Sequence, residues 1–123
     1  PPIKLDVSVP AAAWVELASS VAGVVAGADP DATVIAYGHV ADGNVQVNIV
    51  PAAPADGRHE DAVLSFVAEL GGSVSAEHGI GALKARWLPL ARSAAELDLF
   101  ARIRAAFDPA GLLNPHVLPR QSG

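Results

Sequence analysis

The dipeptide Asp42-Gly43, which lies between two β-rich segments, is the feature that most constrains the fold of this chain. Asp-Gly is favoured in two-residue hairpin turns, because the type I′ turn needs a positive φ at both central residues. Residues 33–40 and 44–50 on either side are rich in β-branched side chains, as strands are. The sequence therefore predicts an antiparallel hairpin.

A type I′ turn would also fix which residues face each other across this hairpin. His39 is then expected to pair with Gln46, and Tyr37 with Asn48, on one side of the sheet. We therefore expect a polar strip of His39, Gln46 and Asn48 on the face opposite the core. A solvated sheet face with ordinary polar residues is the simpler interpretation, and the pattern alone leaves both open.

The other periodicities complete the predicted fold. Alternating apolar residues predict a strand over 3–9, and apolar steps of three and four predict helices from Trp14, after Gly57 and after Ser93. Residues 73–76 are compatible with a short fourth strand. This order is the split βαβ, or ferredoxin-like, plan. We therefore expect an α+β fold: an antiparallel sheet with helices on one face plus a C-terminal helix.

Composition narrows the class of protein. The net charge of −5 and the pI near 5.1, without a basic run, exclude the electrostatic footprint of a nucleic-acid-binding protein. Polar residues and prolines interrupt the apolar stretches, so we expect no membrane span, and the length suggests one domain. With no cysteine, disulfides and thiolate metal sites are excluded and the redox compartment is undetermined. We expect a cytoplasmic location.

The segment 75–81 (SAEHGIG) combines adjacent Glu77 and His78 with two glycines. Glutamate and histidine serve as metal ligands or as acid–base groups. In an extended chain their side chains would point to opposite faces, so both can serve one site only if the chain bends here. The glycines permit such a bend, although a plain surface loop is the alternative.

Other candidates are weaker. His59 stands in a charged cluster at a helix start and is expected to be solvated, and His116 has no evident partner in the terminal loop. The chain contains neither a dinucleotide fingerprint nor a P-loop.

Four segments resemble motifs of the FAD-linked oxidases of the vanillyl-alcohol-oxidase type, which include D-lactate, glycolate and D-2-hydroxyglutarate dehydrogenases. Segment 38–48 (GHVADGNVQVN) resembles G-H-x-x-D-G-N-x-H-x-N, and 75–81 matches S-A-E-H-G-I-G. Segment 4–10 (KLDVSVP) resembles K-x-D-[VI]-S-[VL]-P, and 107–115 (FDPAGLLNP) resembles F-D-P-x-x-[LI]-[LM]-N-P. The four motifs occur in the family's order across almost the whole chain.

This resemblance implies that residues 1–123 are the C-terminal, substrate- and metal-binding portion of a longer flavoenzyme whose FAD-binding domain lies elsewhere in the parent chain. It implies that His39 and Glu77 bind a divalent metal such as zinc, and that His78 takes the substrate's hydroxyl proton while hydride leaves for the flavin. Lys4 and Asn48 match residues that contact the substrate. Which residues bind FAD is not implied.

Gln46 departs from the family pattern, because it replaces the second metal-binding histidine. An amide oxygen is a weaker ligand for zinc than an imidazole. Three outcomes are open: weaker metal binding, a harder cation such as Mg²⁺ or Mn²⁺, or no metal.

The leading hypothesis is therefore part of an FAD-dependent oxidoreductase acting on a small D-2-hydroxy acid, inactive as an isolated fragment. The alternative is a stand-alone ferredoxin-like binding or interaction module without redox activity, and a hydrolase using Glu77 and His78 is a third. A domain this apolar, cut from its neighbours, is also expected to self-associate as a homodimer through the open sheet face or an edge strand.

Overall fold

The computed structural model describes residues 1–54 and 56–117. The chain divides into two compact units, Pro1–Gly79 and a second that begins at Ile80.

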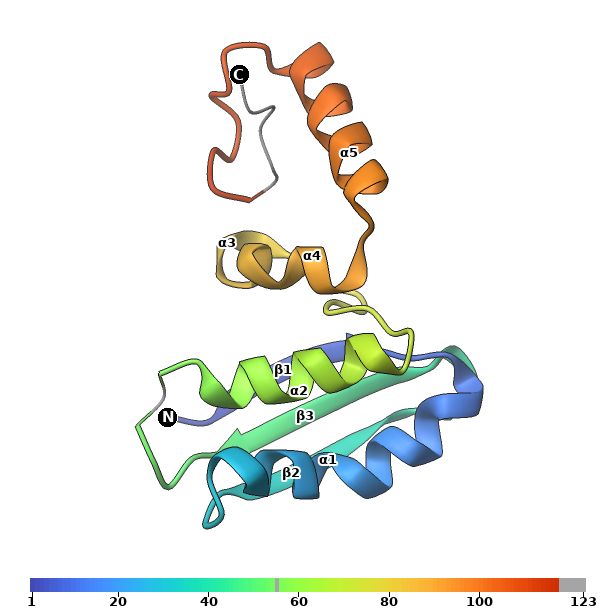
Figure 1. Ribbon diagram of the computed structural model, residues 1–123, viewed down its shortest axis with the longest axis vertical. Helices are drawn as coiled ribbons and strands as arrows, with labels where there is room; N and C mark the ends of the chain where they lie inside the picture. Colours follow the sequence, from blue (N-terminus) through green and yellow to red (C-terminus); the bar gives the residue numbers. More distant parts are fainter. Residues whose placement is uncertain (55, 118–123) are drawn as a thin grey trace. The chain divides into compact units, whose positions relative to one another are not determined.

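The first unit is built on a three-stranded antiparallel sheet (Figure 1). Its strands are β1 (Ile3–Ser8), β2 (Thr33–His39) and β3 (Asn44–Val50), in the order β1-β3-β2. The predicted fourth strand is reduced to one bridge between Ser8 and Ser73. The α+β class is thus confirmed, with β3 as the central strand.

The turn of the hairpin differs from the prediction. Val40–Asp42 form a 3₁₀ turn, and Gly43 alone has a positive φ, of 71°. A Cβ at Gly43 would collide with the carbonyl oxygen of Val9, so this position requires glycine. The main chain of Val9 also donates to the Gly43 carbonyl at 2.9 Å, which fixes the longer turn.

The register shifts with the turn. His39 pairs with Asn44 instead of Gln46, and Tyr37 pairs with Gln46 instead of Asn48. Since the shift is two residues and side chains alternate with a period of two, the side chains of β2 and β3 stay on their predicted faces. The expected pairs were wrong, but the polar strip is present.

Helices α1 (Trp14–Ala28) and α2 (Arg58–Glu69) cover the same face of the sheet (Figure 1). A short 3₁₀ turn, η1 (Ala11–Ala13), precedes α1. The core between the layers is aliphatic, and burial of each such side chain stabilises the fold by about 1.5–3 kcal/mol. Its fully buried members include Val7, Leu17, Val21, Val25, Val45, Val47, Ile49, Val63, Leu64 and Val67.

The stretch Ala11–Ala28 is long and apolar enough, by length and composition alone, to cross a membrane. This corrects the expectation that every apolar stretch is too interrupted to do so. In the structure, Leu17, Val21 and Val25 on this helix are buried in the core of the first unit. The core helix of a globular protein passes the same test, so this feature is weak support for a membrane span.

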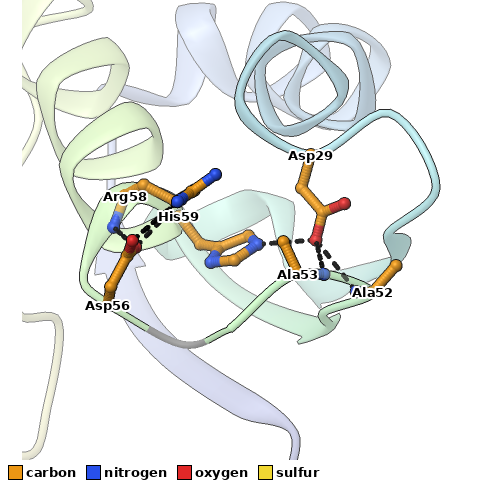
Figure 2. Close-up of polar contacts among 6 residues, drawn as sticks. All are labelled: Asp29, Ala52, Ala53, Asp56, Arg58 and His59. Carbon is orange, nitrogen blue, oxygen red and sulfur yellow. Dashed lines mark hydrogen bonds and ion pairs between the residues drawn. The ribbon is translucent and has the colours of Figure 1, made fainter.

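Asp29 joins three parts of the first unit through its carboxylate (Figure 2). Its Oδ2 accepts the main-chain N–H groups of Ala52 at 2.9 Å and Ala53 at 2.8 Å, and it lies 2.9 Å from Nε2 of His59. The Ala53 hydrogen bond first, and then the His59 ring, hold the pKa of Asp29 below its ordinary value. His59 is 0% exposed, so the prediction that it is solvated was wrong.

The reason for this error is a partner thirty residues away. Arg58, the neighbour of His59, does behave as a surface residue: it makes an exposed ion pair with Asp56 at 2.7 Å. The hydrogen bonds from Arg58 lower the pKa of Asp56. The charged cluster that begins at Arg58 therefore contains both buried and exposed side chains.

The second unit is helical and contains α3 (Gly81–Lys84), the 3₁₀ turn η3 (Ala85–Trp87), α4 (Leu88–Ala91) and α5 (Ala94–Phe107). The predicted capping box is present, because Ser93 and Glu96 each accept a main-chain N–H of the other residue. A pocket of about 330 Å³ lies beside α5. Its lining is Phe100, Ile103, Arg104, Phe107, Asp108, Leu113, Asn114 and Val117.

Candidate functional site

Lys4, Gln46 and Asn48 lie on the sheet face that the helices leave open. In the β1–β3 ladder, Lys4 is opposite Asn48 and Asp6 is opposite Gln46. Lys4 is exposed, and within residues 1–54 and 56–117 its side chain makes no hydrogen bond or ion pair. Asn48 donates from Nδ2 to the Tyr37 hydroxyl at 3.3 Å. A cationic and an amide side chain therefore stand as neighbours on an open surface.

The chain bends at Glu77 and His78, as the glycines permit. The main-chain N–H groups of both residues donate to the same atom, Oδ2 of Asp6, at 3.0 and 3.3 Å. Gly79 follows with φ of 73°, and its carbonyl accepts the Ser75 hydroxyl at 2.7 Å. The expected bend is confirmed.

This bend brings Glu77 and His78 to the open face of the sheet. Glu77 Oε1 accepts a hydrogen bond from Nδ2 of Asn44, the residue that pairs with His39 across the hairpin. Nδ1 of His78 lies 3.4 Å from Asp6 Oδ2, and the His78 side chain is 70% exposed. One face therefore holds His39, Glu77 and His78, although they come from two separate segments, the end of β2 and the bend at residues 77–78.

Asp6 and Asn44 are the residues that sequence reasoning missed. Asp6 is only 5% exposed, although it lies on the open face, because residues 77–78 cover it. Asn44 is 7% exposed, and its Oδ1 is buried without a hydrogen-bond partner among the described residues. The alternation of β1 places Asp6 on the face of Lys4, and this signal could have identified it.

The predicted metal ligands can be compared with this geometry. Nε2 of Gln46 donates to Asp6 Oδ1 at 2.6 Å, Glu77 Oε1 is occupied by Asn44, and His39 Nδ1 is 3.9 Å from Asp42 Oδ2. Within the described part of the chain, no group of three or more His, Asp or Glu side chains is placed to bind a metal ion. As the side chains stand, the three predicted ligands do not form a metal-binding group.

The ligand set of His39, Glu77 and Gln46 stays a prediction, which metal analysis of the purified protein can test. His116, the remaining histidine, is exposed and belongs to the second unit.

Comparison with known proteins identifies relatives that are similar over most of this chain. The chain is 33% identical over 122 residues to the D-2-hydroxyglutarate dehydrogenase of Stutzerimonas stutzeri, covering 93% of this chain and 26% of that protein. It is 41% identical over 92 residues to the mitochondrial D-2-hydroxyglutarate dehydrogenase of Arabidopsis thaliana, covering 72% of this chain and 16% of the relative.

An FAD-linked oxidoreductase of Mycobacterium tuberculosis is 35% identical over 115 residues, which cover 93% of this chain and 25% of that protein. The chain thus spans about a quarter or less of the length of these curated relatives. Residues 1–118 match the family described as FAD linked oxidases, C-terminal domain. The chain belongs to this family of FAD-linked oxidases.

Proposed function

We propose that this chain is the substrate-binding part of an FAD-dependent oxidoreductase that oxidises a small D-2-hydroxy acid to the 2-oxo acid. The observation that supports this most is the convergence of Lys4, Asn48 and His78 on the open sheet face of the first unit. The relatives named D-2-hydroxyglutarate dehydrogenase make that acid the first substrate to test.

Lys4, Asn48 and His78 have separate roles in this reaction. The ammonium group of Lys4 and the amide of Asn48 bind the substrate carboxylate, and this contact orients the α-carbon. The neutral imidazole of His78 takes the hydroxyl proton as the C–H bond breaks. FAD, when bound, accepts the hydride from the α-carbon. The substrate thus loses one proton and one hydride, which balances its two-electron oxidation.

The proposal places FAD mainly in another part of the parent protein, so residues 1–123 alone are expected to be inactive. The test uses the full-length gene product under anaerobic conditions, with D-2-hydroxyglutarate and its L-isomer as substrates. We expect loss of the oxidised-flavin absorbance with the D-isomer only, and no loss when the isolated chain is mixed with FAD. If no D-2-hydroxy acid bleached the flavin, the proposal would be overturned. Turnover by the isolated chain would overturn the claim that FAD is bound mainly in another part of the parent protein.

The second candidate is a binding module without redox activity. The replacement of a family histidine by Gln46, and the commitment of this amide to Asp6, favour it. Full-length protein that binds D-2-hydroxyglutarate but never reduces a flavin would support this candidate instead.

The proposal also includes self-association of the chain and a cytoplasmic location. Ile35 and Tyr37 on edge strand β2 are 55% and 54% exposed, and they extend the open face of the sheet. An exposed apolar edge strand is a common surface for pairing with a second copy.

A further inference from the structure

The carboxylate of Asp6 is the centre of the hydrogen bonds around His78. Oδ1 accepts from Gln46 Nε2 at 2.6 Å, while Oδ2 accepts the main-chain N–H groups of Glu77 and His78. Oδ2 also lies 3.4 Å from His78 Nδ1. A single buried carboxylate therefore contacts both the backbone and the ring of His78.

We infer that Asp6 is a positioning residue for His78: it holds the neutral ring in the tautomer with the proton on Nδ1, so that Nε2 is free to accept the substrate's proton. This inference rests on the proposed function of His78. The tautomer of a histidine is set by the hydrogen bond that its other ring nitrogen makes. A carboxylate only accepts hydrogen bonds, so Oδ2 beside Nδ1 favours the proton there.

The backbone contacts make this arrangement specific. The N–H groups of Glu77 and His78 bind the same oxygen that lies beside the ring, so one atom both fixes the turn and contacts the ring. As Nδ1 takes part in this contact, and the His78 side chain is 70% exposed, Nε2 is the nitrogen left for a ligand.

Gln46 has a defined part in this cluster. Its Nε2 occupies Oδ1 and so directs Oδ2 toward residues 77–78. The amide therefore orients Asp6, a role that explains how a glutamine can serve at this position.

The first test measures the tautomer directly in the 123-residue chain, by long-range ¹H–¹⁵N correlation of the histidine rings under alkaline conditions where the rings are neutral. His78→Gln assigns the signal by its loss. We expect mainly the Nδ1–H form of His78 in the wild type and mainly the Nε2–H form in Asp6→Asn. Asp29→Asn is the matched control, and it is expected to leave the His78 ring unchanged. An Nε2–H ring in the wild type would overturn the inference.

The second test uses steady-state kinetics of the full-length protein. General-base catalysis contributes roughly 10²–10⁴-fold, so Asp6→Asn is expected to lower kcat by about tenfold or more with little change in KM. Gln46→Leu, which removes only the orienting donor, is expected to act in the same direction but less. A purely structural role for Asp6 would change kcat and KM together and would shift the Lys4 and Asn48 amide resonances.

The outcomes separate the inference from the proposed function. If His78→Gln abolishes turnover and a well-folded Asp6→Asn protein keeps the wild-type kcat, the inference fails and the proposed function stands. If His78→Gln keeps full activity, the proposed role of His78 fails, and the inference fails with it.

Discussion

Two buried aspartates of the first unit, Asp29 and Asp6, make nearly the same set of contacts with opposite consequences. Each accepts two successive main-chain N–H groups on Oδ2, and each lies beside a histidine ring. His59 beside Asp29 is 0% exposed, whereas the His78 side chain beside Asp6 is 70% exposed. Similar contacts therefore hold a buried histidine, His59, in the interior of the unit and an exposed histidine, His78, at its surface.

The difference lies in what surrounds each histidine. His59 is enclosed, and its Nδ1 is buried without a hydrogen-bond partner among the described residues, so its role is to join α2 to the Asp29 turn (Figure 2). The segment that carries His78 is held to the sheet by Asp6 and by the Glu77–Asn44 hydrogen bond, and the His78 side chain stays exposed. Asp29 and His59 thus provide an internal control for every statement about Asp6 and His78.

The largest expected contrast is between the two histidines. His78→Gln in the full-length protein is expected to lower kcat by about 10²-fold or more without lowering Tm, since a general base contributes 10²–10⁴-fold. His59→Gln is expected to lower Tm and to leave kcat per folded molecule unchanged. Turnover and thermal melts of both variants test this, and the reverse assignment of effects would break the comparison.

Lys4 tests whether the open cluster binds the substrate. A hydrogen bond to a charged group contributes about 1.5–3 kcal/mol, so Lys4→Ala is expected to raise KM about ten- to a hundredfold, with a smaller effect on kcat. Lys84→Ala, in the second unit, is the matched control for loss of one positive charge. Equal KM changes in the two variants would contradict the role of Lys4.

The pH dependence of folding tests the closed cluster. The pKa of Asp29 is lowered from its ordinary 3.8, so the unfolded chain binds this proton more readily than the folded one. The stability that Asp29 contributes is therefore fully present above the ordinary value and is lost as the pH falls through the folded value. Urea midpoints measured at about pH 5.5 and pH 3 are expected to differ less in Asp29→Asn than in the wild type. An identical pH dependence in both proteins would contradict this.

The smallest expected effect concerns the edge of the open face. Light scattering of the isolated chain is expected to show a mass that rises with concentration, and Ile35→Lys is expected to weaken this by placing a charge on the β2 edge. A monomeric mass at every concentration would contradict the predicted self-association.

Sequence reasoning succeeded where local chemistry decides the structure. The capping box at Ser93, the positive φ of Gly79 in the bend and the face of the polar strip all depend on residues close together in the chain. The predicted hairpin register was wrong because the turn depends on the approach of Val9 to Gly43, a contact between distant segments.

The same reason explains the two misjudged clusters. The burial of His59 depends on Asp29, and the burial of Asp6 depends on residues 77–78, which are more than seventy positions away. Pattern alone records that a side chain is polar and which face it shares. It does not record which distant segment covers it.

The most direct test of the central claim is a titration of the ¹⁵N-labelled chain with D-2-hydroxyglutarate. The account predicts saturable amide shifts at Lys4, Asn48 and the Glu77–His78 turn, with none at Ala52, Ala53 or His59. Shifts confined to the Asp29 cluster or to the pocket beside α5, with the open sheet face unaffected, would contradict it.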